Sequence, residues 1–258
     1  MLIKLLKYDL KYMLKNMMVF YVLSLFFAVT TRIFFLLGDS AMMQILLQIS
    51  MGGLFAMIAN ILLNSLMRSW VRFKESIFKD ESYLTHTLPV TKNNIYDSKM
   101  IQSLVFFITG FAVIVIDLII AFFSKERWQL VKNFVNNMTS GTYFVIVILL
   151  LLFLELYNAL QCGYLGMILG YGKNRAKSGF SALFGFIAYI LSQSMVILST
   201  FILALFNPSI MDYFKNNANP SPDAFKLLSV FVIIIYLIIV RIMSLVSKKI
   251  FNRGVNIE

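Results

Sequence analysis

Six long apolar stretches, separated by short polar connections, dominate the pattern of this 258-residue chain. They lie near residues 17–37, 41–67, 100–123, 143–169, 180–206 and 227–247. A helix of about 20 residues crosses the roughly 30 Å hydrocarbon layer of a bilayer, so each stretch is long enough for one span. The pattern predicts an all-α membrane protein with six transmembrane helices, in a single membrane domain covering residues 1–258.

The residues before the first span form a different pattern. Apolar side chains recur there at intervals of three and four on one helical face, and lysines recur on another: Leu2, Leu6, Leu10 and Met13 against Lys4, Lys7, Lys11 and Lys15. This is typical of a basic amphipathic helix that lies in the headgroup layer. We expect such an elbow helix at residues 1–16, either as a simple anchor or also in contact with a cytoplasmic partner.

Positive charge marks alternate connections between the spans. Of the 23 Lys and Arg residues, only Arg32, Lys125, Arg127, Lys132, Lys215 and Lys226 fall on the outer side if the N-terminus is cytoplasmic. The positive-inside rule then predicts a multi-pass protein of the cell (plasma) membrane with both termini in the cytoplasm. The net charge of +11 is accounted for by orientation and by contact with anionic lipid, so we expect no nucleic-acid partner.

Several enzyme classes lack their residues in this sequence. Cys162 is the only cysteine and His86 the only histidine, so a Cys/His metal cluster is excluded. The chain has no GxxxxGK[ST] phosphate loop, no HExxH and no GxSxG. We therefore expect neither an enzyme nor a cofactor or metal bound by this chain.

Small residues recur at helical spacing in the fifth span, at Ser181, Gly185, Ala188 and Ser192. Such a stripe lets helices approach closely within lipid. It predicts either packing inside the monomer or a subunit interface.

Two outer connections differ in character. Ser124–Thr142 carries Trp128 and other apolar residues at near-helical spacing and is expected to rest on the outer membrane surface. Asn207–Phe225 contains three prolines and several asparagines, and is expected to be an irregular loop.

Polar side chains within the spans are candidates for a translocation path. Asp117 lies in the third span and Glu155 in the fourth, where Asn158 follows on the same helical face. Asn60 and Asn64 are one turn apart in the second span. Ionisable groups in a membrane by default line a cavity or pair within the bundle. These residues are therefore either a polar patch for a substrate, with a cation as one option, or structural hydrogen-bonding groups.

The longest inner connection, Arg68–Lys99, carries large apolar residues among its charges: Trp70, Phe73, Ile77, Phe78, Tyr83 and Leu84. Exposed apolar groups mixed with charge are typical of a protein interaction surface, and the alternative is a loop folded back on the membrane. Leu88-Pro89 ends any helix here, and Thr91 is placed to cap a second helix leading into the third span.

The stretch FKDESYLTHTLPV at residues 78–90, with Ser98-Lys99 before the third span, resembles the first cytoplasmic loop of ABC-2-type transporter permeases. The six spans, the amphipathic N-terminus and the short basic tail resemble that family in layout. The resemblance implies a permease subunit of an ATP-driven exporter that forms half of a translocation pathway. It implies two copies of a separate ABC ATP-binding subunit, which bind ATP and Mg²⁺, and a second permease, identical or homologous.

The resemblance also implies which residues couple ATP hydrolysis to the spans. A coupling helix between the second and third spans would sit in a cleft of the ATP-binding subunit, through Phe78, Asp80, Glu81, Tyr83, Leu84 and Leu88. The loop Tyr171–Ser178 would be a second, smaller contact. The family exports peptides, antibiotics or other amphipathic compounds.

Two other functions fit part of the pattern. A partner-independent transporter or channel often shows repeated halves and helices broken at the midplane, and this chain shows neither. A membrane scaffold or immunity protein without transport would carry the same interaction loop and remains open.

Overall fold

The computed structural model describes residues 2–38, 40–79, 81–87, 90–122, 141–216 and 222–253. These residues form helices and no strands: α1 (Leu2–Leu36), α2 (Ala41–Phe78), α3 (Ser82–Thr87), α4 (Lys92–Phe122), α6 (Gly141–Tyr171), α7 (Lys177–Phe206), α8 (Pro208–Asn216) and α9 (Pro222–Asn252). Six of them are long and apolar enough to cross a membrane. The predicted all-α fold with six spans is therefore confirmed, and the chain is a multi-pass membrane protein.

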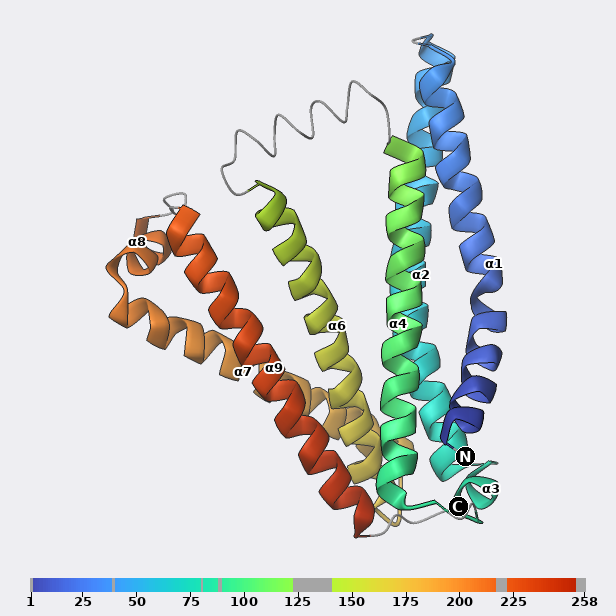
Figure 1. Cartoon of the computed structure of the whole chain (residues 1–258), viewed down its shortest axis with the longest axis vertical. Helices are drawn as coiled ribbons and strands as arrows, with labels where there is room; N and C mark the ends of the chain where they lie inside the picture. The colour runs from blue at the N-terminus through green and yellow to red at the C-terminus, as the bar shows by residue number, and fades with distance from the viewer. Residues whose placement is uncertain are drawn as a thin grey trace. The chain divides into compact units, whose positions relative to one another are not determined.

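The residues divide into two compact units, which are described separately. The first contains Met1–Phe73 and Thr87–Lys132, and the second contains Lys74–His86 and Asn133–Glu258. The first unit therefore holds α1, most of α2 and α4. The second holds the last turn of α2, most of α3, and α6 to α9 (Figure 1).

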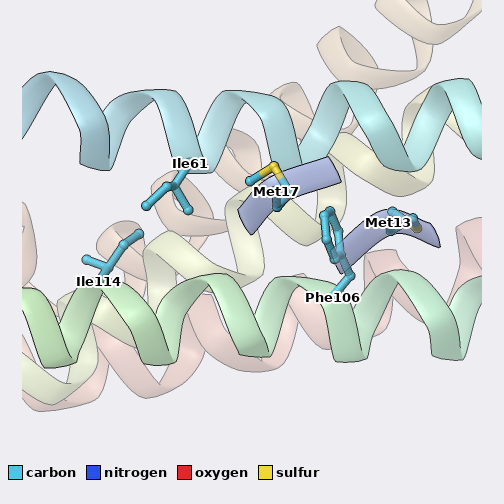
Figure 2. Packing of buried hydrophobic residues seen from close by; sticks show 5 residues of the cluster. All are labelled: Met13, Met17, Ile61, Phe106 and Ile114. Atoms are coloured by element: carbon cyan, nitrogen blue, oxygen red, sulfur yellow. The ribbon is translucent and has the colours of Figure 1, made fainter. Parts of the chain in front are cut away.

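An apolar core joins the three helices of the first unit. Met13 and Met17 of α1 meet Ile61 of α2 and Phe106 and Ile114 of α4, and all five side chains are buried (Figure 2). The buried positions of α1 thus begin well before the predicted start of the first span.

Helix α1 runs without interruption from Leu2 to Leu36, so the predicted amphipathic residues 1–16 and the first span belong to one helix. Met13, on the apolar face of that segment, packs in the core of the first unit. This packing accounts for the apolar side chain of Met13 without a membrane surface, and the interfacial elbow stays a prediction.

The second unit is built on close contact between α6 and α7. The buried residues of α7 include Ser181, Gly185, Ala188 and Ser192. A Cβ placed on Gly166 of α6 would lie 2.4 Å from the backbone nitrogen of Gly185. The small residues of the fifth span therefore pack against α6 inside the monomer, as one of the two interpretations predicted.

The expectation of an irregular loop at Asn207–Phe225 was wrong for its first half. Residues Pro208–Asn216 form α8, and the Asn207 side chain accepts hydrogen bonds from the backbone nitrogens of Ser209 and Ile210 at 3.1 and 3.4 Å. Asparagine at the N-cap and proline at the first helical position both favour a helix start. Pro222 likewise begins α9.

Candidate functional site: the inter-helical segment and the intramembrane polar groups

The segment that resembles a coupling loop has the predicted order of helix, break and helix. Helix α2 continues past the predicted end of its span to Phe78, α3 covers Ser82–Thr87, and α4 begins at Lys92. The Thr91 side chain accepts a hydrogen bond from the backbone nitrogen of Asn94 at 3.4 Å, which confirms Thr91 as the N-cap. Asp80 and Leu88 lie outside the described residues, as do residues 124–140 of the outer connection that carries Trp128.

Helix α3 has one buried and one exposed face. Ser82 and Thr85 are buried, whereas Tyr83 is 75% exposed and Leu84 67% exposed. Glu81, just before α3, is half-buried. Two adjacent large side chains, Tyr83 and Leu84, are thus exposed together on one face of α3.

Phe78 has a different place from Tyr83 and Leu84. Its ring is fully buried and stacks on Tyr171 at the end of α6, with the ring centroids 4.3 Å apart and an interplanar angle of 19°. Phe78 therefore cannot offer its ring directly to a partner, as a surface contact requires. It instead connects the end of α2 to the end of α6 within the second unit.

The predicted second contact, Tyr171–Ser178, adjoins this stack. Residues 172–176 between α6 and α7 are exposed, including Lys173 and Arg175. The Lys74 ammonium lies 3.5 Å from the Ser178 hydroxyl. The two segments that the resemblance assigns to an ATP-binding partner are thus joined by direct contacts in one unit.

A buried ion cluster holds three helices of the first unit together. Asp9 of α1 accepts hydrogen bonds from Arg72 of α2, from Nε at 2.8 Å and from Nη2 at 2.6 Å. Its other oxygen lies 2.5 Å from the Lys99 ammonium of α4. All three side chains are at most 4% exposed. One carboxylate therefore bridges the helix that leads into the α3 segment and the helix that leaves it.

Aromatic rings also lie beside this cluster. The Arg72 guanidinium lies over the rings of Tyr12 and Tyr8, 5.1 and 6.0 Å from their centroids. Delocalised guanidinium charge is stabilised by such contacts. Asp9 was not predicted as a site residue. It is the only acidic residue before position 39 and precedes Met13 and Met17 at four-residue steps. The sequence therefore already indicated that Asp9 shares a helical face with these two buried methionines.

The polar candidate residues of the first unit differ in burial. Asn60 and Asn64 are half-buried, and the Asn64 amide donates to the Asn60 backbone oxygen at 3.0 Å and to its side-chain oxygen. Asp117 is fully buried, and neither of its carboxyl oxygens has a hydrogen-bond partner among the described residues. Asp117 therefore lies away from the exposed surface of the first unit, and its place on a translocation path stays a prediction.

Glu155 is the centre of a polar cluster in the second unit. Its carboxylate accepts hydrogen bonds from the Tyr189 hydroxyl of α7 at 2.6 Å and from the Gln193 amide at 2.8 and 2.9 Å. The Tyr236 hydroxyl of α9 donates to its other oxygen. The three partners, which the sequence interpretation missed, tie α6, α7 and α9 to one carboxylate.

Asn158 faces α7 like Glu155, as the spacing predicted, but it is fully buried. Its amide donates to the Ser192 hydroxyl at 2.9 Å, and the Cys162 sulfur lies 3.9 Å from the same hydroxyl. Asn158 thus satisfies an interhelical hydrogen bond within the small-residue stripe, which is a structural role.

Among the described residues, no group of three or more His, Cys, Asp or Glu side chains is placed to hold a metal ion. Comparison of the chain with models of known protein families, with curated proteins and with solved structures gave no match. The geometry and the sequence therefore carry the functional argument.

Proposed function

We propose that the chain is the permease subunit of an ATP-driven exporter of the ABC-2 type. The observation that carries the proposal is the exposed pair Tyr83 and Leu84 on a short helix between two membrane helices, within the stretch that resembles a coupling loop. The six spans and the basic, exposed loop between α6 and α7 support the same function.

The contacts around Phe78 suggest how a partner would act on the spans. Docking of an ATP-binding subunit on α3 would apply a mechanical load directly to the end of α2. Through the Phe78–Tyr171 stack and the Lys74–Ser178 contact, the same load would reach α6 and α7. Packed aromatic contacts transmit displacement as a rigid body because interiors are dense and nearly incompressible.

The remaining parts of the assembly follow from this assignment. The sequence holds no phosphate loop, so ATP and Mg²⁺ would be bound by two copies of a separate subunit. A second permease, identical or homologous, would complete the pathway. We place both termini in the cytoplasm and the protein in the plasma membrane, with the lysines of α1 near anionic lipid.

A mild-detergent pull-down from native membranes tests the proposal. We expect an ATP-binding-cassette protein to copurify with the tagged chain, identified by mass spectrometry. The double variant Tyr83→Glu, Leu84→Glu should lose that protein, because two charges replace the apolar contact. Phe214→Glu is the matched control, since Phe214 is 52% exposed but lies on α8, beyond the opposite end of α7.

Recovery of the wild-type chain alone, at good yield in several detergents, would contradict the proposal. Retention of the ATP-binding protein by the Tyr83, Leu84 variant would contradict the assignment of α3 as its docking surface.

A further inference from the structure

Glu155 lies near the midpoint of α6, and its partner Tyr236 lies near the midpoint of α9. Both helices are candidate membrane spans, so the carboxylate is at the depth of the hydrocarbon layer. Its side chain is half-buried, in contrast to the fully buried Asp117 and Asn158. Part of Glu155 therefore reaches the surface of the second unit.

The hydrogen-bond donors around the Glu155 carboxylate are neutral groups. Its partners are two phenol hydroxyls and one amide, all neutral, and none of the described basic side chains forms an ion pair with it. Asp9 shows the opposite case, because two cations contact that single carboxylate. Neutral donors fix the orientation of the Glu155 side chain, but none of them supplies a positive charge to offset a carboxylate in the membrane.

The side chains around Glu155 suit a cation with an apolar body. Tyr236 is packed in an apolar cluster with Leu154, Val196 and Ile239. The hydroxyls of Tyr189 and Tyr236 donate to the carboxylate, so two aromatic side chains adjoin it. Aromatic faces and a carboxylate together attract organic cations, and a single carboxylate without further acidic ligands does not favour a divalent metal.

We propose that Glu155, with Tyr189 and Tyr236, binds the positively charged group of a lipophilic organic cation. Such a ligand can reach a carboxylate at membrane depth by partitioning into the bilayer. Binding of the cation is a property of this chain alone. That the cation is also a transported substrate rests on the proposed function.

The test is equilibrium binding of tetraphenylphosphonium to the purified full chain in lipid nanodiscs. Tetraphenylborate, which has the same shape and the opposite charge, is the ligand control. We expect saturable binding of the phosphonium and no competition by the borate. Glu155→Gln keeps the size of the side chain and its ability to hydrogen-bond. It should weaken binding of the phosphonium about tenfold or more, as expected for loss of an ionic partner.

Asp212→Asn is the matched protein control, because it removes the same charge from an exposed position of the second unit. Its affinity for the phosphonium should equal that of the wild type. Equal affinity of Glu155→Gln and wild type, or the absence of saturable binding to folded wild-type protein, would overturn the proposal.

A second measurement decides the matter if Glu155→Gln does not fold. A photoreactive aryl azide of the same phosphonium is cross-linked to the wild-type chain and mapped by mass spectrometry. Labelling of the central peptides of α6, α7 and α9, suppressed by excess tetraphenylphosphonium, supports the site. Labelling confined to other helices overturns it. Neither result depends on whether an ATP-binding subunit copurifies, so the two proposals fail separately.

Discussion

Replacing Asp9 by Asn is expected to destabilise the first unit severely, although the substitution preserves shape. Arg72 and Lys99 would then both lose the carboxylate that they contact, at a place where solvent does not reach them. The introduced amide has one acceptor oxygen and two donor hydrogens, so it cannot serve both cations.

The distances allow the size of the effect to be worked out. Arg72 Nη2 lies 2.6 Å from Asp9 Oδ1, and two unit charges at that separation attract by about 6 kcal/mol at an effective dielectric constant of about 20. Removing three charged groups from water opposes this by several kcal/mol for each ion. The cluster as a whole is therefore close to neutral in free energy, but breaking it by deleting one partner should cost about 3–5 kcal/mol.

The assay is unfolding of the purified chain in mixed micelles with increasing SDS, followed by circular dichroism. Asp223→Asn is the matched control, because its side chain is 96% exposed and lies 3.9 Å from an exposed lysine. Loss of such a surface pair changes stability by about 0–1 kcal/mol. Replacing Asp9, Arg72 and Lys99 together by Leu, Met and Met should restore most of the stability lost in Asp9→Asn.

Two results would refute this reasoning. One is an unfolding midpoint of Asp9→Asn that equals that of Asp223→Asn. The other is a triple apolar variant that is less stable than Asp9→Asn.

Two further changes test the packing of the second unit. Gly166→Ala should destabilise the protein by about 1–3 kcal/mol, because the new Cβ would meet the backbone of Gly185 at 2.4 Å. Gly52→Ala, which meets nothing within 4 Å, should be neutral or stabilise by up to about 1 kcal/mol; equal SDS midpoints for both would contradict the close contact. Phe78→Ala should destabilise the protein by about 3–5 kcal/mol through loss of a fully buried ring. Tyr83→Ala should leave stability within about 0.5 kcal/mol of wild type. A larger loss of stability in Tyr83→Ala than in Phe78→Ala would contradict the assigned burial.

The membrane spans could be predicted from the sequence because length and apolarity are local properties. The same is true of the Thr91 cap and the small-residue stripe of α7, where residue type and spacing decide the outcome. The ends of the helices were harder to predict from the sequence. Helix α2 runs on through Arg72 to Phe78, because a helix can continue beyond the apolar stretch when tertiary contacts such as the Arg72–Asp9 ion pair hold its charged side chains.

The parts that could not be predicted depend on residues distant in sequence. Asp9 meets Arg72 across 63 positions and Lys99 across 90. Glu155 meets Tyr236 across 81 positions. Nothing in the local pattern distinguishes Tyr236 from any other tyrosine of an apolar span. Burial of Phe78 was hidden for the same reason, since its partner Tyr171 lies at the end of another helix.

Helix α8 was missed for a different reason, because the sequence does contain the signals for a helix start. Asn207 and Pro208 form a good helix start, yet proline was interpreted only as a breaker of regular structure. The position of a proline within a helix decides its effect.

The central claim is that the exposed face of α3 docks on an ATP-binding subunit, and photo-cross-linking in intact native membranes tests it most directly. A photoreactive amino acid is placed at Tyr83, with the same substitution at Phe214 as the control, and the adducts are identified by mass spectrometry. The account predicts that position 83, and not position 214, captures an ATP-binding-cassette protein. Adducts at position 83 that contain only lipid, or the same proteins as at position 214, would contradict it.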